Sequence, residues 1–277
     1  MHELDNDIVQ FHIRQQQIAV LQVNRPKARN ALSWSAQQRF ADLVKGVALD
    51  PIIRVLIITG TGNHAFVSGG DLKELIHHPE RAAGERLNRV MSSALAQLTR
   101  LPIPVIAAVN GDALGGGCEI VTACDLRIAA GSARFSFAHV RNGLTTGWGG
   151  TGRLIRLVGE SRAMELLLTA RLIGAEEARR TGLVHRVVSN HEDVLESAMD
   201  WANELIELPS DALAAAKALV FAAGNRPPAE LGEFEAKQFV ELWETANHKE
   251  ALAAFQQKRP PRFNRDWPLD APGQGGS

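Results

Sequence analysis

Two glycine-rich segments are the places in this sequence where backbone groups could do chemistry. The first is Ala65-Phe-Val-Ser-Gly-Gly-Asp-Leu-Lys-Glu74, and the second is Asn110-Gly-Asp-Ala-Leu-Gly-Gly-Gly-Cys-Glu119. Each follows an apolar run typical of a buried strand, and glycine leaves the backbone N–H groups open to a ligand. Convergent N–H groups can bind an anion or stabilise a developing oxyanion. Taken alone, a glycine turn between a strand and a helix is more often structural, so the segments indicate such a site without establishing it.

Neither glycine pattern matches a known phosphate-binding loop. The sequence has no Gly-x-Gly-x-x-Gly followed by an acidic residue at the spacing of a dinucleotide fold, and no Walker loop. It also contains no tyrosine, which removes the phenol as an acid, base or oxyanion donor. Glu119 ends the second glycine segment, and an acidic residue in a first helical turn is stabilised by the helix dipole, which is a structural reason for its presence there.

The cysteines and histidines predict neither a disulfide framework nor a metal site. Cys118 and Cys124 are six residues apart, so on one helix they would point in different directions. His77 and His78 are adjacent and diverge on a helix, and His64 stands alone. We expect no metal and no resident cofactor.

Apolar periodicity places the glycine segments at the ends of strands in an α/β fold. The patterns predict a helix over 34–49, capped by Ser33, and strands over 8–13, 18–23, 54–59, 104–109, 126–129 and 134–137. Each glycine segment follows one of the two fully apolar strands. A loop rich in Gly and Thr, over 143–152, then leads into helices.

Length and composition predict a globular chain of one large or two moderate domains. The 277 residues are 45% hydrophobic and 22% charged. Helical periodicity dominates 191–255, with more apolar positions than a solvated helix pair needs. We therefore divide the chain into a core over 1–190, a helical C-terminal region over 191–265 and a disordered tail over 266–277.

Charge and hydropathy exclude several classes of partner. The formal net charge is −1, so no overall basic field would attract nucleic acid or an anionic membrane surface. The longest apolar runs are much shorter than the roughly 18 residues of a membrane helix, and the acidic start is unlike a signal peptide. We expect a cytoplasmic protein with no nucleic-acid or membrane partner.

Several motifs in one order along the chain resemble the enoyl-CoA hydratase/isomerase family, also called the crotonase superfamily. The resemblance covers residues 5–265 and rests on segments 24–32, 65–74, 102–125, 149–154, 181–184 and 263–265. It implies an α/β crotonase (ClpP-like) spiral of ββα units with a helical C-terminal oligomerisation region. It also implies an acyl-CoA substrate, with coenzyme A as part of that substrate, and a homotrimer or homohexamer.

The resemblance assigns roles to backbone and loop residues. The amides of Gly70 and Gly116 would form an oxyanion hole for the thioester carbonyl of the acyl-CoA. Arg25, Lys27 and Ala28 would contribute to the coenzyme A site. Because the N–H group matters more than the side chain, we expect Gly116→Pro to abolish turnover and Gly116→Ala to be milder.

The catalytic side chains depart from the family pattern. Family hydratases carry two glutamates; Glu119 matches the first, and His139 stands at the second. In hydration one carboxylate acts on water and the other exchanges the α-proton, whereas an imidazole can also donate at neutral pH. This difference weakens the hydratase interpretation, and His139 could instead be a histidine buried for structural reasons.

Within the family, the sequence most resembles the ethylmalonyl-CoA/methylmalonyl-CoA decarboxylase branch. The resemblance rests on segments 122–127, 137–139 and 147–150 and on Leu242-Trp243. Trp148 stands where ordinary hydratases have a small residue, so it would reshape the acyl pocket or fill core space. Loss of carbon dioxide from a malonyl thioester generates an enolate directly, and a second carboxylate would repel the substrate's own.

We therefore favour an acyl-CoA lyase that decarboxylates a short branched malonyl-CoA through an enolate held by the two glycine amides. Glu119 and His139 would position the carboxylate and deliver the proton, in either order. The first alternative is an enoyl-CoA hydratase or isomerase using Glu119. The second is a relative of low turnover that binds coenzyme A or RNA, with RNA disfavoured by the balanced charge.

Overall fold

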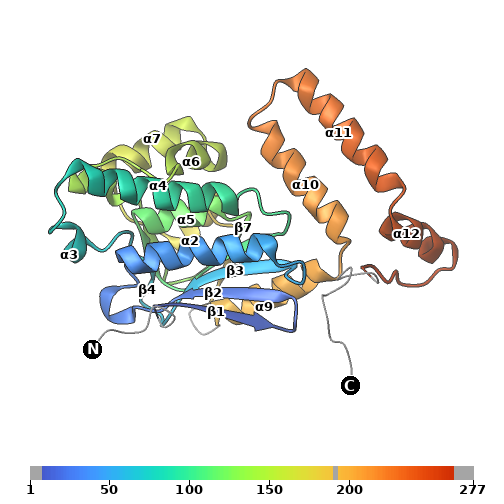
Figure 1. The fold of residues 1–277 in the computed structure, drawn as a ribbon, viewed down its shortest axis with the longest axis horizontal. Helices are drawn as coiled ribbons and strands as arrows, with labels where there is room; N and C mark the ends of the chain where they lie inside the picture. The colour runs from blue at the N-terminus through green and yellow to red at the C-terminus, as the bar shows by residue number, and fades with distance from the viewer. Residues whose placement is uncertain (1–7, 190–192, 265–277) are drawn as a thin grey trace.

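The computed structural model describes residues 8–189 and 193–264, and it is built around two β-sheets (Figure 1). The larger sheet is parallel except for its first strand, β1, which pairs antiparallel with β2. Its strand order is β1 (Val9–Arg14), β2 (Ile18–Val23), β3 (Val55–Gly60), β5 (Val105–Val109), β7 (Leu126–Ala130) and β10 (Arg186–Val188). All the strands predicted for this sheet are confirmed to within about two residues.

The smaller sheet has four short strands and sits beside the ends of the larger one. Its order is β4 (Ala65–Val67), β6 (Asp112–Leu114), β8 (Arg134–Ser136) and β9 (Ile173–Gly174). Successive strands alternate between the sheets: β3, β5 and β7 belong to the larger, and β4, β6 and β8 to the smaller. The chain therefore advances as a spiral of ββα units, as the resemblance implied.

Helices cover both faces of the larger sheet and create two apolar cores (Figure 1). On one face lie α2 (Trp34–Leu49), α4 (Arg81–Leu98) and α5 (Gly116–Ala123), and on the other lies α9 (Val194–Ile206). Strand alternation divides the residues: Leu56 and Ile58 face the first core, whereas Val55 and Ile57 face α9. The predicted cap is confirmed, since the Ser33 hydroxyl accepts the Ala36 N–H at 3.2 Å.

Short helices connect these layers near the smaller sheet. They are η1 (Pro26–Ala28), α3 (Leu72–Leu75), η2 (Ala138–Asn142), α6 (Gly150–Val158), α7 (Glu160–Thr169) and α8 (Ala175–Arg180). Helix α6 packs on α5, and α7 packs near η2. This packing brings the Gly/Thr-rich loop before α6 against the first turn of α5.

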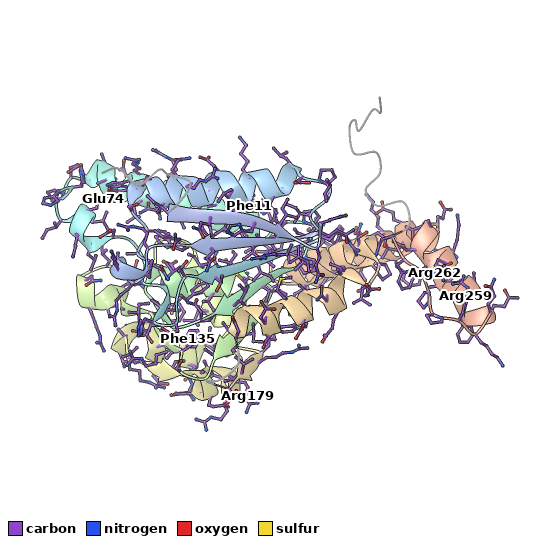
Figure 2. All side chains as sticks on the ribbon, turned by 90° about the horizontal axis from the view of Figure 1, so that it is seen from below. Phe11, Glu74, Phe135, Arg179, Arg259 and Arg262 are labelled. Carbon is purple, nitrogen blue, oxygen red and sulfur yellow. The ribbon has the colours of Figure 1, made fainter. Side chains whose placement is uncertain are left out.

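Three further helices form an arm beside the body. They are α10 (Ser210–Ala223), α11 (Pro228–Trp243) and α12 (Ala246–Gln256). Figure 1 shows the α10–α11 pair apart from the sheets, and Figure 2 shows Arg259 and Arg262 at the far end of the arm. The boundary predicted near 190 precedes α9, which packs on the larger sheet, whereas the arm begins at α10. The tail predicted over 266–277 lies outside the described residues.

Clustered metal ligands and membrane-spanning helices are both absent from the described residues. In 8–189 and 193–264, no group of three or more His, Cys, Asp or Glu side chains could hold a metal ion. Over the same residues, no helix has the length and apolar character to span a membrane. Cys118 and Cys124 are both free and buried.

Candidate active site

The fold brings the two oxyanion candidates together. Gly70 follows β4, and Gly116 begins α5 directly after β6. Gly69 is the residue before Gly70, and a Cβ built on it would lie only 3.2 Å from the Gly116 nitrogen. The backbone around Gly70 is therefore nearly in contact with the backbone at Gly116. Within the described part of the chain, neither the Gly70 nor the Gly116 N–H donates a backbone hydrogen bond. Two neighbouring N–H groups are thus open to a ligand, and their role as an oxyanion hole stays a prediction.

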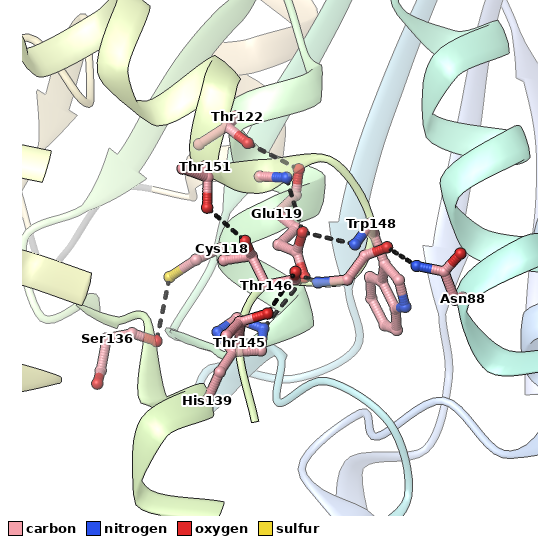
Figure 3. Close-up of polar contacts among 12 residues, drawn as sticks. Asn88, Cys118, Glu119, Thr122, Ser136, His139, Thr145, Thr146, Trp148 and Thr151 are labelled. Carbon is pink, nitrogen blue, oxygen red and sulfur yellow. Dashed lines mark hydrogen bonds and ion pairs between the residues drawn. The ribbon is translucent and has the colours of Figure 1, made fainter. Parts of the chain in front are cut away.

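The Glu119 carboxylate lies one helical turn further along α5 and is almost fully buried, with 1% of its side chain exposed. It accepts four hydrogen bonds (Figure 3). Oε1 accepts from Gly147 N at 3.2 Å and from His139 Nε2 at 3.1 Å, and Oε2 accepts from Trp148 N and Gly150 N, each at 2.8 Å. A carboxylate offers about four lone-pair positions, so the hydrogen-bonding capacity of Glu119 is filled.

His139 comes from η2 and is the one titratable side chain that contacts this carboxylate among the described residues. Because a carboxylate only accepts, the imidazole Nε2 must carry the shared hydrogen. Nε2 also lies 3.9 Å from the position of a Cβ built on Gly115, beside the oxyanion glycines. The Nδ1 atom is buried and has no hydrogen-bond partner among the described residues. The structure thus joins the two predicted catalytic residues in one pair.

The loop that binds Glu119 is held from its other side by two residues that the sequence analysis missed. Asn88 of α4 donates to the Gly147 carbonyl, and Arg153 Nη2 donates to the Trp148 carbonyl at 2.7 Å. These contacts turn the carbonyls away from Glu119 and leave the N–H groups facing it. Arg153 lies in segment 149–154, which already supported the resemblance, so its position carried a signal. Asn88 lies in a stretch for which no helix or strand was predicted, so nothing in the sequence indicated its role.

Arg153 also binds α5 itself. Its guanidinium lies 3.4 Å from the Glu119 carbonyl and 3.3 Å from the Thr122 hydroxyl, and it donates to both. Burial lowers the pKa of Arg153, an effect that the Glu119 charge opposes. One side chain therefore fastens the loop and the helix that carries the carboxylate.

Trp148 lies between α5 and α4, with 4% of its surface exposed (Figure 3). Its indole rests on Gly116, because a Cβ built on that glycine would overlap ring atoms Cζ3 and Cη2. Gly116→Ala therefore carries a packing cost that the sequence did not indicate, because the new methyl would meet a buried aromatic ring. Whether it lowers turnover less than Gly116→Pro stays a prediction.

Cys118, which precedes Glu119 in the sequence, is not a candidate nucleophile. Burial raises the pKa of Cys118 far above its ordinary value, and its Sγ donates to the Ala113 carbonyl at 3.0 Å. Only the thiolate is strongly nucleophilic, so Cys118 is a packing residue.

The residues predicted for the coenzyme A site surround η1. Arg25 precedes η1 and donates to Asp71 Oδ2 at 2.8 Å and to the Ala31 carbonyl at 2.6 Å. Its charge therefore ties this loop to the segment that follows Gly70. Lys27 is exposed, and Ala28 ends the short helix. Lys27 is the residue of the three with a charge facing solvent.

Comparison with known proteins agrees with this arrangement. A family model described as enoyl-CoA hydratase/isomerase matches residues 13–266. The chain belongs to the enoyl-CoA hydratase/isomerase family. Its relatives include a short-chain-enoyl-CoA hydratase of Clostridium acetobutylicum, 38% identical over 260 residues that span 93% of this chain and 97% of that protein. A crotonyl-CoA hydratase of Syntrophomonas wolfei is 38% identical over 250 residues, which span 90% and 95% of the two chains.

A solved structure supports membership at the level of fold. The crystal structure of an enoyl-CoA hydratase from Bacillus anthracis superimposes with a TM-score of 0.88 at 32% identity, covering 92% of this chain and 98% of that one. The crotonase fold predicted from the motifs is confirmed. In this member of the enoyl-CoA hydratase/isomerase family, a histidine contacts the buried glutamate.

Proposed function

We propose that this protein hydrates a short 2-enoyl-CoA thioester. The observation that carries the proposal is the buried Glu119–His139 pair beside the open amides of Gly70 and Gly116. The relatives named above are a short-chain-enoyl-CoA hydratase and a crotonyl-CoA hydratase, which supports hydration over the decarboxylation favoured by the sequence motifs.

The two amides would supply the electrostatic part of the reaction. As water adds to C3, the electrons of the double bond move to the thioester oxygen and form an enolate. The Gly70 and Gly116 N–H groups would donate to that oxygen at about 2.7–3.1 Å. Loss of one such donor costs about 3–4 kcal/mol of barrier in a well-studied enzyme, so these amides should outweigh any single positioning contact.

The Glu119–His139 pair would move the proton. It accepts a proton from the attacking water and returns one to C2, which completes the addition of H and OH across the double bond. Since all four acceptor positions of Glu119 are filled, the carboxylate reaches water only when one donor gives way. Three of the four donors are backbone N–H groups of one loop that Asn88 and Arg153 hold in place. His139 is the side-chain donor, so we assign to His139 the movement that opens Glu119 to water.

Decarboxylation of a short malonyl-CoA remains the second candidate, because one observation favours it. Glu119 accepts hydrogen bonds from three backbone N–H groups and from His139, and by the family resemblance His139 stands where hydratases have a second glutamate. A pocket of this kind repels a substrate carboxylate less than a pair of glutamates would. Loss of carbon dioxide would leave the same enolate on the same two amides.

One assay separates the candidates. The protein is incubated in D2O with crotonyl-CoA and, separately, with methylmalonyl-CoA and ethylmalonyl-CoA, and products are followed by mass. We expect 3-hydroxybutyryl-CoA carrying one deuterium at C2 and no loss of carbon dioxide. Release of carbon dioxide without hydration would establish the decarboxylase instead. Binding of coenzyme A esters without turnover of any of them would favour the third reading, a binding relative.

A further inference from the structure

The side chains packed beside the two open amides bear on the size of the acyl group. We propose that Trp148 determines acyl-chain length by limiting the site to short acyl chains. The proposal rests on the proposed function in one respect, namely that the acyl thioester binds at Gly70 and Gly116.

The indole packs on the glycine whose N–H would bind the thioester oxygen. A thioester oxygen bound to the Gly116 N–H lies about 3 Å from that nitrogen, so the carbonyl carbon lies within a few ångströms of the Gly116 Cα. The Trp148 ring packs directly on this Cα and is 4% exposed. A long chain leaving the carbonyl on this side would have to occupy the volume of the ring.

The ring is held in place by its own backbone. Trp148 N donates to Glu119, its carbonyl accepts from Arg153, and the preceding carbonyl accepts from Asn88. Peptide groups on both sides of the Trp148 Cα are thereby fixed, so the side chain cannot leave by a movement of the loop alone. The indole acts as a wall.

Two leucine side chains lie close to the other predicted oxyanion residue, Gly70. A Cβ built on Gly70 would lie 3.2 Å from Leu75 Cδ1 and 3.8 Å from Leu87 Cδ1. Leu87 is adjacent to Asn88 on α4, so the helix that narrows this side also fastens the Trp148 loop. Apolar side chains therefore lie beside both amides, so an acyl chain bound there would pack against them.

Chain-length selectivity follows from this packing. In an open apolar pocket every added methylene strengthens binding, because it removes further apolar surface from water. At a closed pocket the added methylenes instead meet side chains that are already well packed, which weakens binding. A single methylene changes discrimination by about 10- to 200-fold in enzyme pockets, so four of them give a measurable effect.

The test measures binding of saturated thioesters, which cannot be hydrated. Butyryl-, hexanoyl- and octanoyl-CoA are titrated calorimetrically into the wild-type protein, Trp148→Phe and Trp148→Ala. Both variants keep the backbone N–H that binds Glu119. Trp201→Phe is the matched control, because Trp201 packs in the second core on α9, away from the two glycines.

We expect the wild type to bind butyryl-CoA at least tenfold more tightly than octanoyl-CoA. Trp148→Ala should shift this ratio at least tenfold toward octanoyl-CoA, Trp148→Phe should shift it less, and Trp201→Phe should leave it unchanged. If Trp148→Ala fails to fold, Trp148→Phe decides the question alone. Equal wild-type affinities, or a folded Trp148 variant with the wild-type ratio, would overturn the proposal. Crotonyl-CoA hydration is assayed separately, so failure of hydration with the expected ratios would reject only the proposed function.

Discussion

At the scale of single residues, the pair formed by Glu119 and His139 decides what the site can do. We expect Glu119→Gln to lower crotonyl-CoA hydration by about 100-fold or more, since general acid–base groups contribute about 10²–10⁴-fold. The glutamine side chain would also place an NH2 group against backbone N–H donors that face a carboxylate oxygen in the wild type. Steady-state kinetics with circular dichroism of the folded variant measures this. Turnover within a few-fold of wild type would show that Glu119 takes no part in proton transfer.

His139→Glu restores the second carboxylate of the family hydratases. We expect the ratio of hydration to any decarboxylation to rise by about tenfold, because two carboxylates suit hydration and repel a malonyl substrate. The ratio is a better readout than either rate, since the change also alters packing against Glu119. His139→Gln is the neutral comparison and should lower both activities without that bias. A ratio that falls in His139→Glu would contradict the assignment.

Gly116 also has a packing role, because its Cα is covered by the Trp148 ring. We expect Gly116→Ala to lower the free energy of unfolding by about 1–3 kcal/mol through overpacking. Urea unfolding measures this loss. The double variant Gly116→Ala with Trp148→Ala removes the overlap, so its loss should be smaller than the sum of the two single losses. Additive losses would mean that the ring and the methyl do not meet.

At the scale of elements, the site forms where α6 and the loop before it pack against α5. Arg153 of α6 donates hydrogen bonds both to that loop and to α5. Arg153→Leu leaves the buried Trp148 carbonyl without its arginine donor and removes one of the donors to the Glu119 carbonyl, which keeps the Thr122 hydroxyl. We expect a loss of about 2 kcal/mol in unfolding free energy, since an unpaired buried group costs about 1–3 kcal/mol. We also expect kcat to fall at least tenfold while KM changes little, because the loop orients Glu119. Arg156→Leu, the same change at an exposed site on α6, should leave kcat unchanged. A matching loss in both variants would refute the positioning role.

At the scale of the whole molecule, the arm of α10–α12 exposes more apolar surface than a free helical region should. Its exposed large apolar side chains include Val220, Phe239, Val240, Trp243 and Phe255, of which Phe255 is 87% exposed. We therefore expect a trimer or hexamer, with a mass three or six times the 30.1 kDa of the chain by light scattering. Phe255→Glu should weaken that assembly if the arm carries it. A wild-type monomer would refute the prediction.

Much of the architecture could be read from apolar periodicity. The strands of the larger sheet, the helix from Trp34 and its Ser33 cap were predicted, because local hydrogen bonding and one buried face dictate them. Whether α9 belongs to the body or to the arm could not be predicted, because its helical pattern would be the same in either place. Only the pairing of Val55 and Ile57 with α9 places it in the body.

For the site, Gly70, Gly116 and Glu119 could be proposed in advance because they lie in the local motifs that carry the family resemblance. The contacts of Glu119 could not, since they depend on a loop 28 to 31 residues further along the chain and on Asn88 of another helix. The Gly116 contact with Trp148 likewise depends on packing between distant segments, so the packing cost of Gly116→Ala could not be predicted from the sequence. Local residue types thus indicate which groups can react. Tertiary packing alone determines which groups meet, because a close contact depends on the positions of two backbones that the local sequence does not relate.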